Sequence, residues 1–249
     1  MRMDINCDMG ESFGRYALGY DAELLPLVTS VNIACGFHAG DPLVMAQTVR
    51  LARQAGVAIG AHPGYPDLQG FGRRNMELST EEVEALLLYQ VGALAAFVRA
   101  EGAELTHVKP HGALYNQAAR QPTLAAAIAR AVRRFSRDLV LVGLAGSALI
   151  AAGNEAGLKT AAEGFAERGY TSAGALMARS EPGALIHDPQ QAAAQAVRLA
   201  EQGISFDGQR VTVTTICIHG DSPNAPAIAQ AVRMALQAAN FELRPLQEA

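Results

Sequence analysis

The chain has 249 residues, 50% of them hydrophobic, which is enough for one large α/β domain over residues 1–249. A net charge of -4 without any lysine- or arginine-rich run argues against nucleic acid or an anionic membrane surface as a partner. The N-terminus lacks the apolar core of a signal peptide, and no apolar run approaches the roughly 20 residues of a membrane span. We therefore expect a cytoplasmic protein with small-molecule and protein partners.

Short apolar runs alternate with alanine-rich amphipathic segments, a pattern typical of a mostly parallel sheet. In chain order, the predicted strands are 3–8, 30–35, 57–62, 106–111, 138–144, 159–164 and 211–219. The predicted helices, with their caps, are 41–56, 79–102, 122–135, 147–156, 188–203 and 224–239. Asp41 and Asp188 each precede a proline that suits a first helical turn, and Ser79 with Glu82 forms a capping box.

Nearly every predicted strand ends in polar or ionisable residues. Seven strands that each lead toward a helix are compatible with a doubly wound sheet or with a closed barrel. Only a barrel gathers the carboxyl ends of all its strands around one mouth. We therefore predict an α/β fold, an irregular seven-stranded (β/α) barrel similar to a TIM barrel, with these side chains in a shared pocket.

The first three strands each supply a candidate for chemistry. In "DINCDMGE", alternation places Asp8 at the strand end toward the pocket, although it could also only cap the following turn. His38 in "NIACGFHAGDP" has no helical role, whereas Asp41 suits an N-cap, and His62 follows small residues that leave space before its ring. Asp8, His38 and His62 match the composition of a metal site but equally that of an acid/base set, so a divalent metal stays open.

The segment "HVKPHGALYN" places His107, Lys109 and His111 at alternate positions, so they should share one face. Lys109 suits a clamp for a carboxylate, phosphate or developing oxyanion, and His111 a proton transfer beside it. The alternative is a structural pair between Lys109 and a carboxylate across the barrel. His107 enters from the loop side and could be a solvated or hydrogen-bonded first residue of the strand.

Further candidates lie in the second half of the chain and in the loop "GYPDLQGFGRRNM". This loop could cover an anionic substrate as a lid or be an ordinary solvated loop. In "IHGDSP", His219 is a candidate, while Asp221 could only cap a helix. A nucleophilic role for Cys35 stays open, and no CxxC pair indicates redox chemistry or zinc. The catalytic candidates are Asp8, His38, His62, Lys109, His111 and His219, and the substrate-binding candidates are Asn6, Glu11, Asn32, Arg73 and Glu163.

Six segments in order, "DINCDMGESFG", "SVNIACGFHAGDP", "GAHPGYPDLQGFGRR", "VKPHGALYN", "EGFAERGY" and "HGDSP", resemble the LamB/YcsF family from residue 4 to about 223. The resemblance implies a seven-stranded barrel similar to the glycoside hydrolase/deacetylase superfamily. It also implies ATP-dependent hydrolysis of 5-oxoproline (pyroglutamate) to glutamate with two partner subunits, B and C. The chain departs from the family pattern at "AERGY", which concerns contacts of residues 167–170.

No GxxxxGK[ST] loop is present, so we expect ATP to bind the partner subunits as a co-substrate. This chain would then hydrolyse an activated lactam. Asp8, His38 or His62 would deprotonate water, Lys109 would stabilise the anionic oxygen or phosphate, and His111 or His219 would protonate the departing nitrogen. The alternatives are a stand-alone metal-dependent deacetylase or amidohydrolase, and a non-catalytic subunit that binds a carboxylate ligand.

Overall fold

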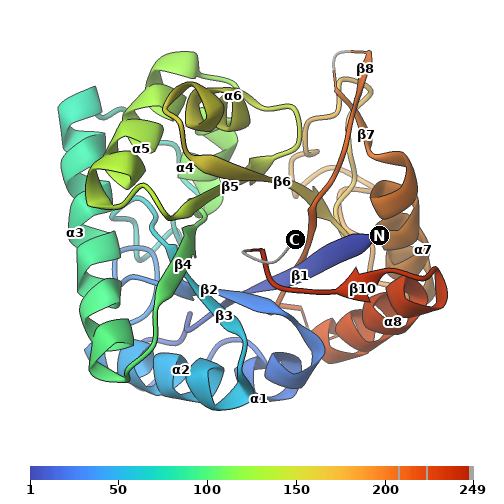
Figure 1. The fold of residues 1–249 in the computed structure, drawn as a ribbon, viewed down its shortest axis with the longest axis horizontal. Coiled ribbons are helices and arrows are strands. Elements are labelled where there is room, and N and C mark those ends of the chain that lie inside the picture. The colour runs from blue at the N-terminus through green and yellow to red at the C-terminus, as the bar shows by residue number, and fades with distance from the viewer. Residues whose placement is uncertain (207, 223, 247–249) are drawn as a thin grey trace.

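Seven parallel strands close into a barrel in the computed structural model, which describes residues 1–206, 208–222 and 224–246 (Figure 1). Each strand pairs with the next in the order β1, β2, β3, β4, β5, β6, β9, and β9 pairs back onto β1. The predicted seven-stranded (β/α) barrel is therefore confirmed. Its strands are β1 (Arg2–Met9), β2 (Ser30–Ala34), β3 (Ala58–His62), β4 (Leu105–Val108), β5 (Val140–Leu144), β6 (Lys159–Phe165) and β9 (Thr215–His219).

Helices surround the barrel on its outer side (Figure 1). They are α1 (Asp21–Leu24), α2 (Pro42–Ala55), α3 (Thr80–Ala100), α4 (Gly112–Ala118), α5 (Pro122–Phe135), α6 (Ala148–Glu155), α7 (Pro189–Gln202) and α8 (Ala225–Ala238), with a 3-10 turn at Leu25–Leu27. Outside the barrel, β7 (Ile204–Phe206) and β8 (Gln209–Val211) form an antiparallel pair, and β10 (Glu242–Leu243) lies beside the start of β1.

The local start signals of the helices act as predicted. The Asp41 carboxylate accepts hydrogen bonds from the backbone N–H groups of Leu43 and Val44 at the start of α2. Ser79 and Glu82 form the capping box of α3. Such caps stabilise a helix by about 1 kcal/mol because they satisfy N–H groups that have no partner within the helix.

Five predicted strands are shorter in the structure, and for two of them the local contacts give the reason. β4 ends at Val108, two residues before Pro110, and His111 is the N-cap of α4. The backbone stays extended to His111, whose N–H bonds to the carbonyl of Pro63, so the side-chain alternation survives the end of the strand. The predicted strand 211–219 is interrupted before β9, because the Thr214 hydroxyl accepts the backbone N–H of Ala162 in place of a carbonyl.

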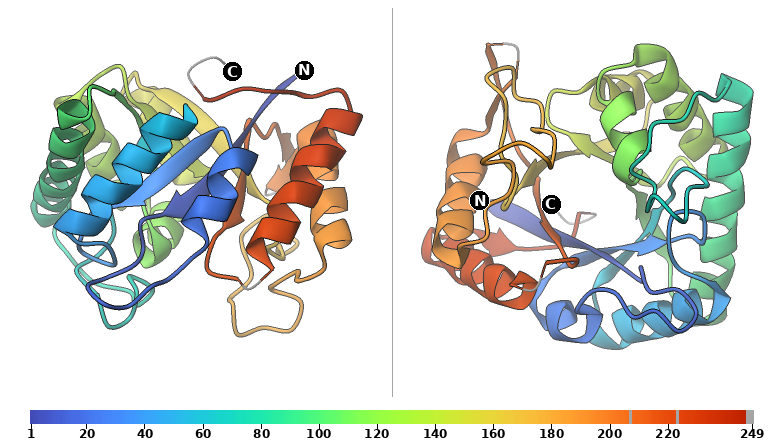
Figure 2. Two further views of the ribbon diagram at one scale, coloured as in Figure 1. Left: turned by 90° about the horizontal axis from the view of Figure 1, so that it is seen from below. Right: turned by 180° about the vertical axis from the view of Figure 1, so that it is seen from behind.

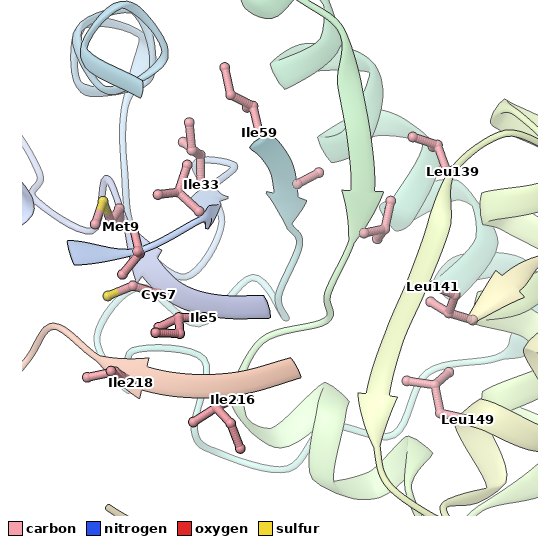
Figure 3. Close-up of a cluster of buried hydrophobic side chains, with 14 of the residues drawn as sticks. Ile5, Cys7, Met9, Ile33, Ile59, Leu139, Leu141, Leu149, Ile216 and Ile218 are labelled. Atoms are coloured by element: carbon pink, nitrogen blue, oxygen red, sulfur yellow. The ribbon is translucent and has the colours of Figure 1, made fainter. Parts of the chain in front are cut away.

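The barrel strands separate an apolar outer layer from a polar interior. On β1, Ile5, Cys7 and Met9 belong to the hydrophobic core, where they lie near Ile33 and Ile218 (Figure 3). The alternate residues on β1, Asp4, Asn6 and Asp8, are all polar. They point the other way, into the barrel, where they too are buried. Since barrel interiors are more often filled with branched apolar residues, this polar interior indicates a functional purpose.

Among the described residues, one helix, α3, is long and apolar enough to cross a membrane by length and composition. It has 21 residues, and an 18-residue window within it reaches a mean hydropathy of 1.5, so the expectation that no apolar run approaches this length was wrong. The side chains of Val83, Leu87, Val91 and Leu94 are buried in the hydrophobic core. An apolar helix that belongs to a protein core meets the same criteria, so the length of α3 is weak evidence of a membrane span.

Candidate active site

The carboxyl ends of the barrel strands open into a cavity of about 500 Å³. Long loops lie at this end of the barrel, and the N-terminus and β10 lie at the opposite end (Figure 2). The cavity is lined by the predicted residues Asp8, Glu11, His62, Lys109, His111 and His219, together with Arg73 and residues from the segments that follow β4 and β6. Active sites of (β/α) barrels are found at this end because the loops of all strands meet there.

A buried ion pair between Asp8 and Lys109 lies at the floor of the cavity. Lys109 Nζ is 2.9 Å from Asp8 Oδ1, and both side chains are nearly fully buried. Burial alone raises the pKa of a carboxyl, but the neighbouring His62 and Lys109 outweigh it and hold the pKa of Asp8 well below its usual range. Asp8 is therefore ionised at neutral pH. The predicted alternation of His107, Lys109 and His111 toward one face is confirmed.

Lys109 also pairs with a second carboxylate, that of Glu163. Tyr115, which the sequence did not indicate as a site residue, holds this carboxylate. Lys109 Nζ is 2.9 Å from Glu163 Oε1 and 3.0 Å from the Cys217 sulfur. The Tyr115 hydroxyl, from α4, donates to Glu163 Oε2 at 2.7 Å. Burial disfavours a charged lysine, yet the charge of Asp8 and these other acidic neighbours raises the pKa of Lys109 well above its usual value. The predicted pair between Lys109 and a carboxylate across the barrel thus exists. Lys109 lies between two carboxylates, that of Asp8 on β1 and that of Glu163 on β6.

A hydrogen-bonded layer of polar side chains supports this pair from inside the barrel. Asn6 donates to Glu163 Oε1 at 3.0 Å, and Asn32 donates to Asp8 Oδ1 at 2.9 Å. His107 Nε2 is 2.8 Å from Asn32 Oδ1, so His107 is a buried member of this layer and not a solvated first residue. The structure places Asn6, Asn32 and Glu163, three predicted substrate-binding residues, fully buried below the cavity. They hold Asp8 and Lys109 in position.

Three histidines and one glutamate gather beside Asp8. His62 Nε2 is 3.3 Å from Asp8 Oδ2 and 2.9 Å from His111 Nδ1, and the ring of His38 stacks on that of His111 at 3.7 Å. Burial lowers the pKa of His38 and of His111 well below the usual value, so both rings are neutral. Burial and the nearby Asp8 charge raise the pKa of Glu11 well above its usual value.

His219 is oriented by a carboxylate on the loop after β6. Its Nδ1 and its backbone N–H both contact Glu167 Oε1, while its Nε2 faces the cavity 3.9 Å from Asp8 Oδ2. The ring of Phe165 stacks on the imidazole at 5.5 Å. A carboxylate on one ring nitrogen fixes the tautomer and leaves the other nitrogen free for proton transfer. The segment "EGFAERGY" carried Glu167, but only the fold shows its partner.

Arginines form the rim of the cavity. Arg73, predicted to bind substrate, pairs with Asp221 at 2.6 Å and keeps part of its side chain exposed. Arg179, which sequence reasoning missed, lies 3.8 Å from the same carboxylate. Asp221 is not a helix cap, because α8 starts after Asn224. The loop with Arg73 packs against the site, since the carbonyl of Phe71 bonds to His111 Nε2 at 2.8 Å.

The cysteines supply no reactive thiolate at this site. Cys7, Cys35 and Cys217 are free and buried. Burial raises the pKa of Cys35 to about 12, which keeps the thiol protonated at neutral pH. The nucleophilic role left open for Cys35 therefore has no structural support.

A closed parallel barrel with carboxylate, lysine and histidine side chains in its mouth defines a (β/α)-barrel protein that carries its reactive groups at the carboxyl ends of its strands. The chain belongs to the LamB/YcsF family, whose model matches residues 3–249. The resemblance seen in the sequence motifs is thereby confirmed.

Relatives match along nearly the whole chain. The protein from Symbiobacterium thermophilum that is named as the A subunit of 5-oxoprolinase is 56% identical over 246 residues, which cover 97% of this chain and 94% of that protein. The crystal structure of a lactam utilization protein from Thermus thermophilus has a TM-score of 0.90 at 50% identity, covering 99% of this chain and 100% of that one. The catalytic domain of a peptidoglycan N-acetylglucosamine deacetylase from Eubacterium rectale shares the fold alone, with a TM-score of 0.53 at 10% identity over 98% and 87% of the two chains.

Proposed function

We propose that this chain is the ring-opening subunit of an ATP-dependent 5-oxoprolinase, a cytoplasmic enzyme that converts 5-oxo-L-proline to L-glutamate with partner subunits B and C. The observation that carries the proposal is the match to proteins named as the A subunit of 5-oxoprolinase, at 52% to 56% identity over nearly the full length. The word "subunit" in those names supports partners. The likeness to deacetylases concerns the fold alone, so a stand-alone deacetylase is not favoured.

The charges of the cavity suit a small anionic substrate. Arg73 and Arg179 at the rim and Lys109 at the floor offer cations at several depths. The substrate 5-oxoproline carries a carboxylate, and a phosphorylated lactam carries a second anionic group. A cation that meets these groups in a partly enclosed cavity interacts with them more strongly than in bulk water.

A lactam is a stabilised amide, so direct attack by water is slow. Transfer of the ATP γ-phosphate to the lactam oxygen, which we assign to the partner subunits, makes the ring carbon more electrophilic. Water then adds to this carbon, the C–N bond breaks, and the nitrogen takes a proton. The resulting acyl phosphate reacts with a second water to give glutamate and phosphate.

The site offers a residue for each need of the ring opening. Asp8 Oδ2 and His219 Nε2 lie 3.9 Å apart on the cavity wall, so a water beside them can contact both. Asp8, which stays ionised, orients this water as a hydrogen-bond acceptor, and His219 Nε2 accepts its proton. Lys109 stabilises the developing oxyanion, and His219, held by Glu167, delivers the proton to the departing nitrogen.

Reconstitution tests the proposal. Glutamate and ADP are measured with 5-oxoproline and ATP for this chain alone, for subunits B and C alone, and for the mixture. We expect turnover only in the mixture, and an approximately hundredfold loss in Glu167→Gln, which keeps the size of the side chain but removes the charge behind His219. The exposed Glu155→Gln is the control. Normal assembly with full turnover in Glu167→Gln would refute this role, and full turnover without this chain would refute the proposed function.

A further inference from the structure

Four ligand-type side chains converge at the back of the cavity, where no step of the proposed reaction uses them together. The ligand atoms of Glu11, His38, His62 and His111 all lie within 4.8 Å of one another, and all four residues are buried. Glu11 Oε1 is 3.5 Å from His38 Nε2 and 3.6 Å from His111 Nδ1. His62 Nε2 is 2.9 Å from His111 Nδ1.

Hydrogen bonds to carbonyl groups fix which nitrogens face this centre. His62 Nδ1 is 2.7 Å from the carbonyl oxygen of Lys109, and His111 Nε2 is 2.8 Å from that of Phe71. A carbonyl oxygen only accepts hydrogen bonds, so each of these nitrogens carries the hydrogen. In neutral rings the other two nitrogens, His62 Nε2 and His111 Nδ1, therefore direct lone pairs at each other. This contact is attractive only if a cation, which can be either a proton or a metal ion, lies between the two nitrogens.

A proton would satisfy this one contact and leave the other two residues unexplained. Among the described side chains, His38 is fully buried with no hydrogen-bond partner on either ring nitrogen, and Glu11 Oε1 is buried without one as well. Buried polar atoms without a partner cost about 1–3 kcal/mol each and are rare in folded proteins. A single metal ion can bond to one atom of each of the four residues.

We propose that Glu11, His38, His62 and His111 bind a divalent transition-metal ion, with zinc as the best fit. Three imidazoles and one carboxylate suit zinc and its transition-metal neighbours, whereas magnesium and calcium prefer oxygen ligands. Bonds of about 2.0–2.1 Å in a tetrahedron place ligand atoms roughly 3.4 Å apart, close to the 3.5 and 3.6 Å separations of Glu11 Oε1 from the two histidines.

The surroundings of the four residues fit this role. The carbonyl groups of Lys109 and Phe71 accept the outer N–H of His62 and His111, as outer partners of metal-bound histidines usually do. Asp8 Oδ2 lies 3.3 Å from His62 Nε2, and Glu11, His62 and His111 themselves line the cavity, so an ion held here would lie at the cavity wall. The ion would supply a Lewis acid beside the cavity, and its binding can be measured without any assay of the proposed reaction.

Metal content of the untagged protein, purified without chelators, tests the proposal. We expect about one zinc or similar ion per chain by elemental analysis, and saturable Zn²⁺ binding by calorimetry after the ion is removed. His38→Ala and His111→Ala should each weaken Zn²⁺ binding by roughly 10- to 100-fold or more. The exposed His187→Ala is the matched control and should bind as the parent chain does.

Circular dichroism of each variant checks that it is folded. Should His38→Ala not fold, Glu11→Gln replaces it, since this change keeps the size of the side chain and removes the charge that would face the ion. Absence of both co-purified metal and saturable Zn²⁺ binding in the folded parent chain would overturn the proposal. Unchanged affinity in the folded histidine or glutamate variants would overturn it as well. Neither result would touch the proposed function, which is read from glutamate formation.

Discussion

Replacement of Lys109 by methionine should destabilise the whole barrel, because it removes the one cation between two buried carboxylates. Lys109 Nζ lies 2.9 Å from Asp8 Oδ1 and 2.9 Å from Glu163 Oε1, and the side chain of Glu163 is fully buried. Removing one partner of a buried ion pair costs about 3–5 kcal/mol, since the remaining charge stays buried without compensation. Methionine has a similar length, so the loss reports mainly on charge. The expected fall in Tm for a chain of this size is roughly 6–20 °C.

Urea unfolding followed by far-UV circular dichroism measures this loss, because the chain has no tryptophan to serve as a fluorescent probe. The exposed Lys159, the second of two lysines, is the matched control, and Lys159→Met should stay within about 0.5 kcal/mol of the parent chain. Adding Glu163→Gln to Lys109→Met should recover part of the loss, since one of the two unpaired charges disappears. A loss below about 1 kcal/mol in Lys109→Met would refute the reasoning, because breaking a buried pair costs more than that.

Two further predictions concern the polar interior. Burial raises the pKa of Asp4 from 3.8 to about 6, so its contribution to stability is present below pH 4 and lost as the pH rises through 6, about 3 kcal/mol in all. Asp4→Asn cannot titrate, so its unfolding free energy, taken relative to the parent chain, should rise by about 2–3 kcal/mol between pH 4 and pH 7. Urea unfolding at several pH values measures this, and a difference that stays constant with pH would contradict it. Gly60→Ala should cost about 1–3 kcal/mol, because a Cβ there overlaps the ring of His107. Gly92→Ala, on an open face of α3, should raise the free energy of unfolding by roughly 0.5–1 kcal/mol. The two glycine variants should therefore shift Tm in opposite directions, and shifts of the same sign would contradict this prediction.

Much of the fold was predictable because its signals are local. The period of two in β1 and in residues 107–111 fixes which side chains share a face, whatever the strand pairs with. Helix α5 lies at the predicted residues, and Asp41 and Ser79 begin α2 and α3 through contacts with residues only two or three positions away. The prediction of a barrel followed from the ionisable residues that end nearly every strand.

The sequence by itself determined the seven barrel strands, most of the helices, the faces of the strands and most of the residues that could carry chemistry. Only the tertiary structure decided which of them meet, because these contacts join residues far apart in the chain. Asn6 and Glu163 are 157 positions apart, and His219 and Glu167 are 52 apart. Strand pairing and barrel closure set such distances, so no local pattern showed that Tyr115 holds Glu163 or that Glu11 faces three histidines.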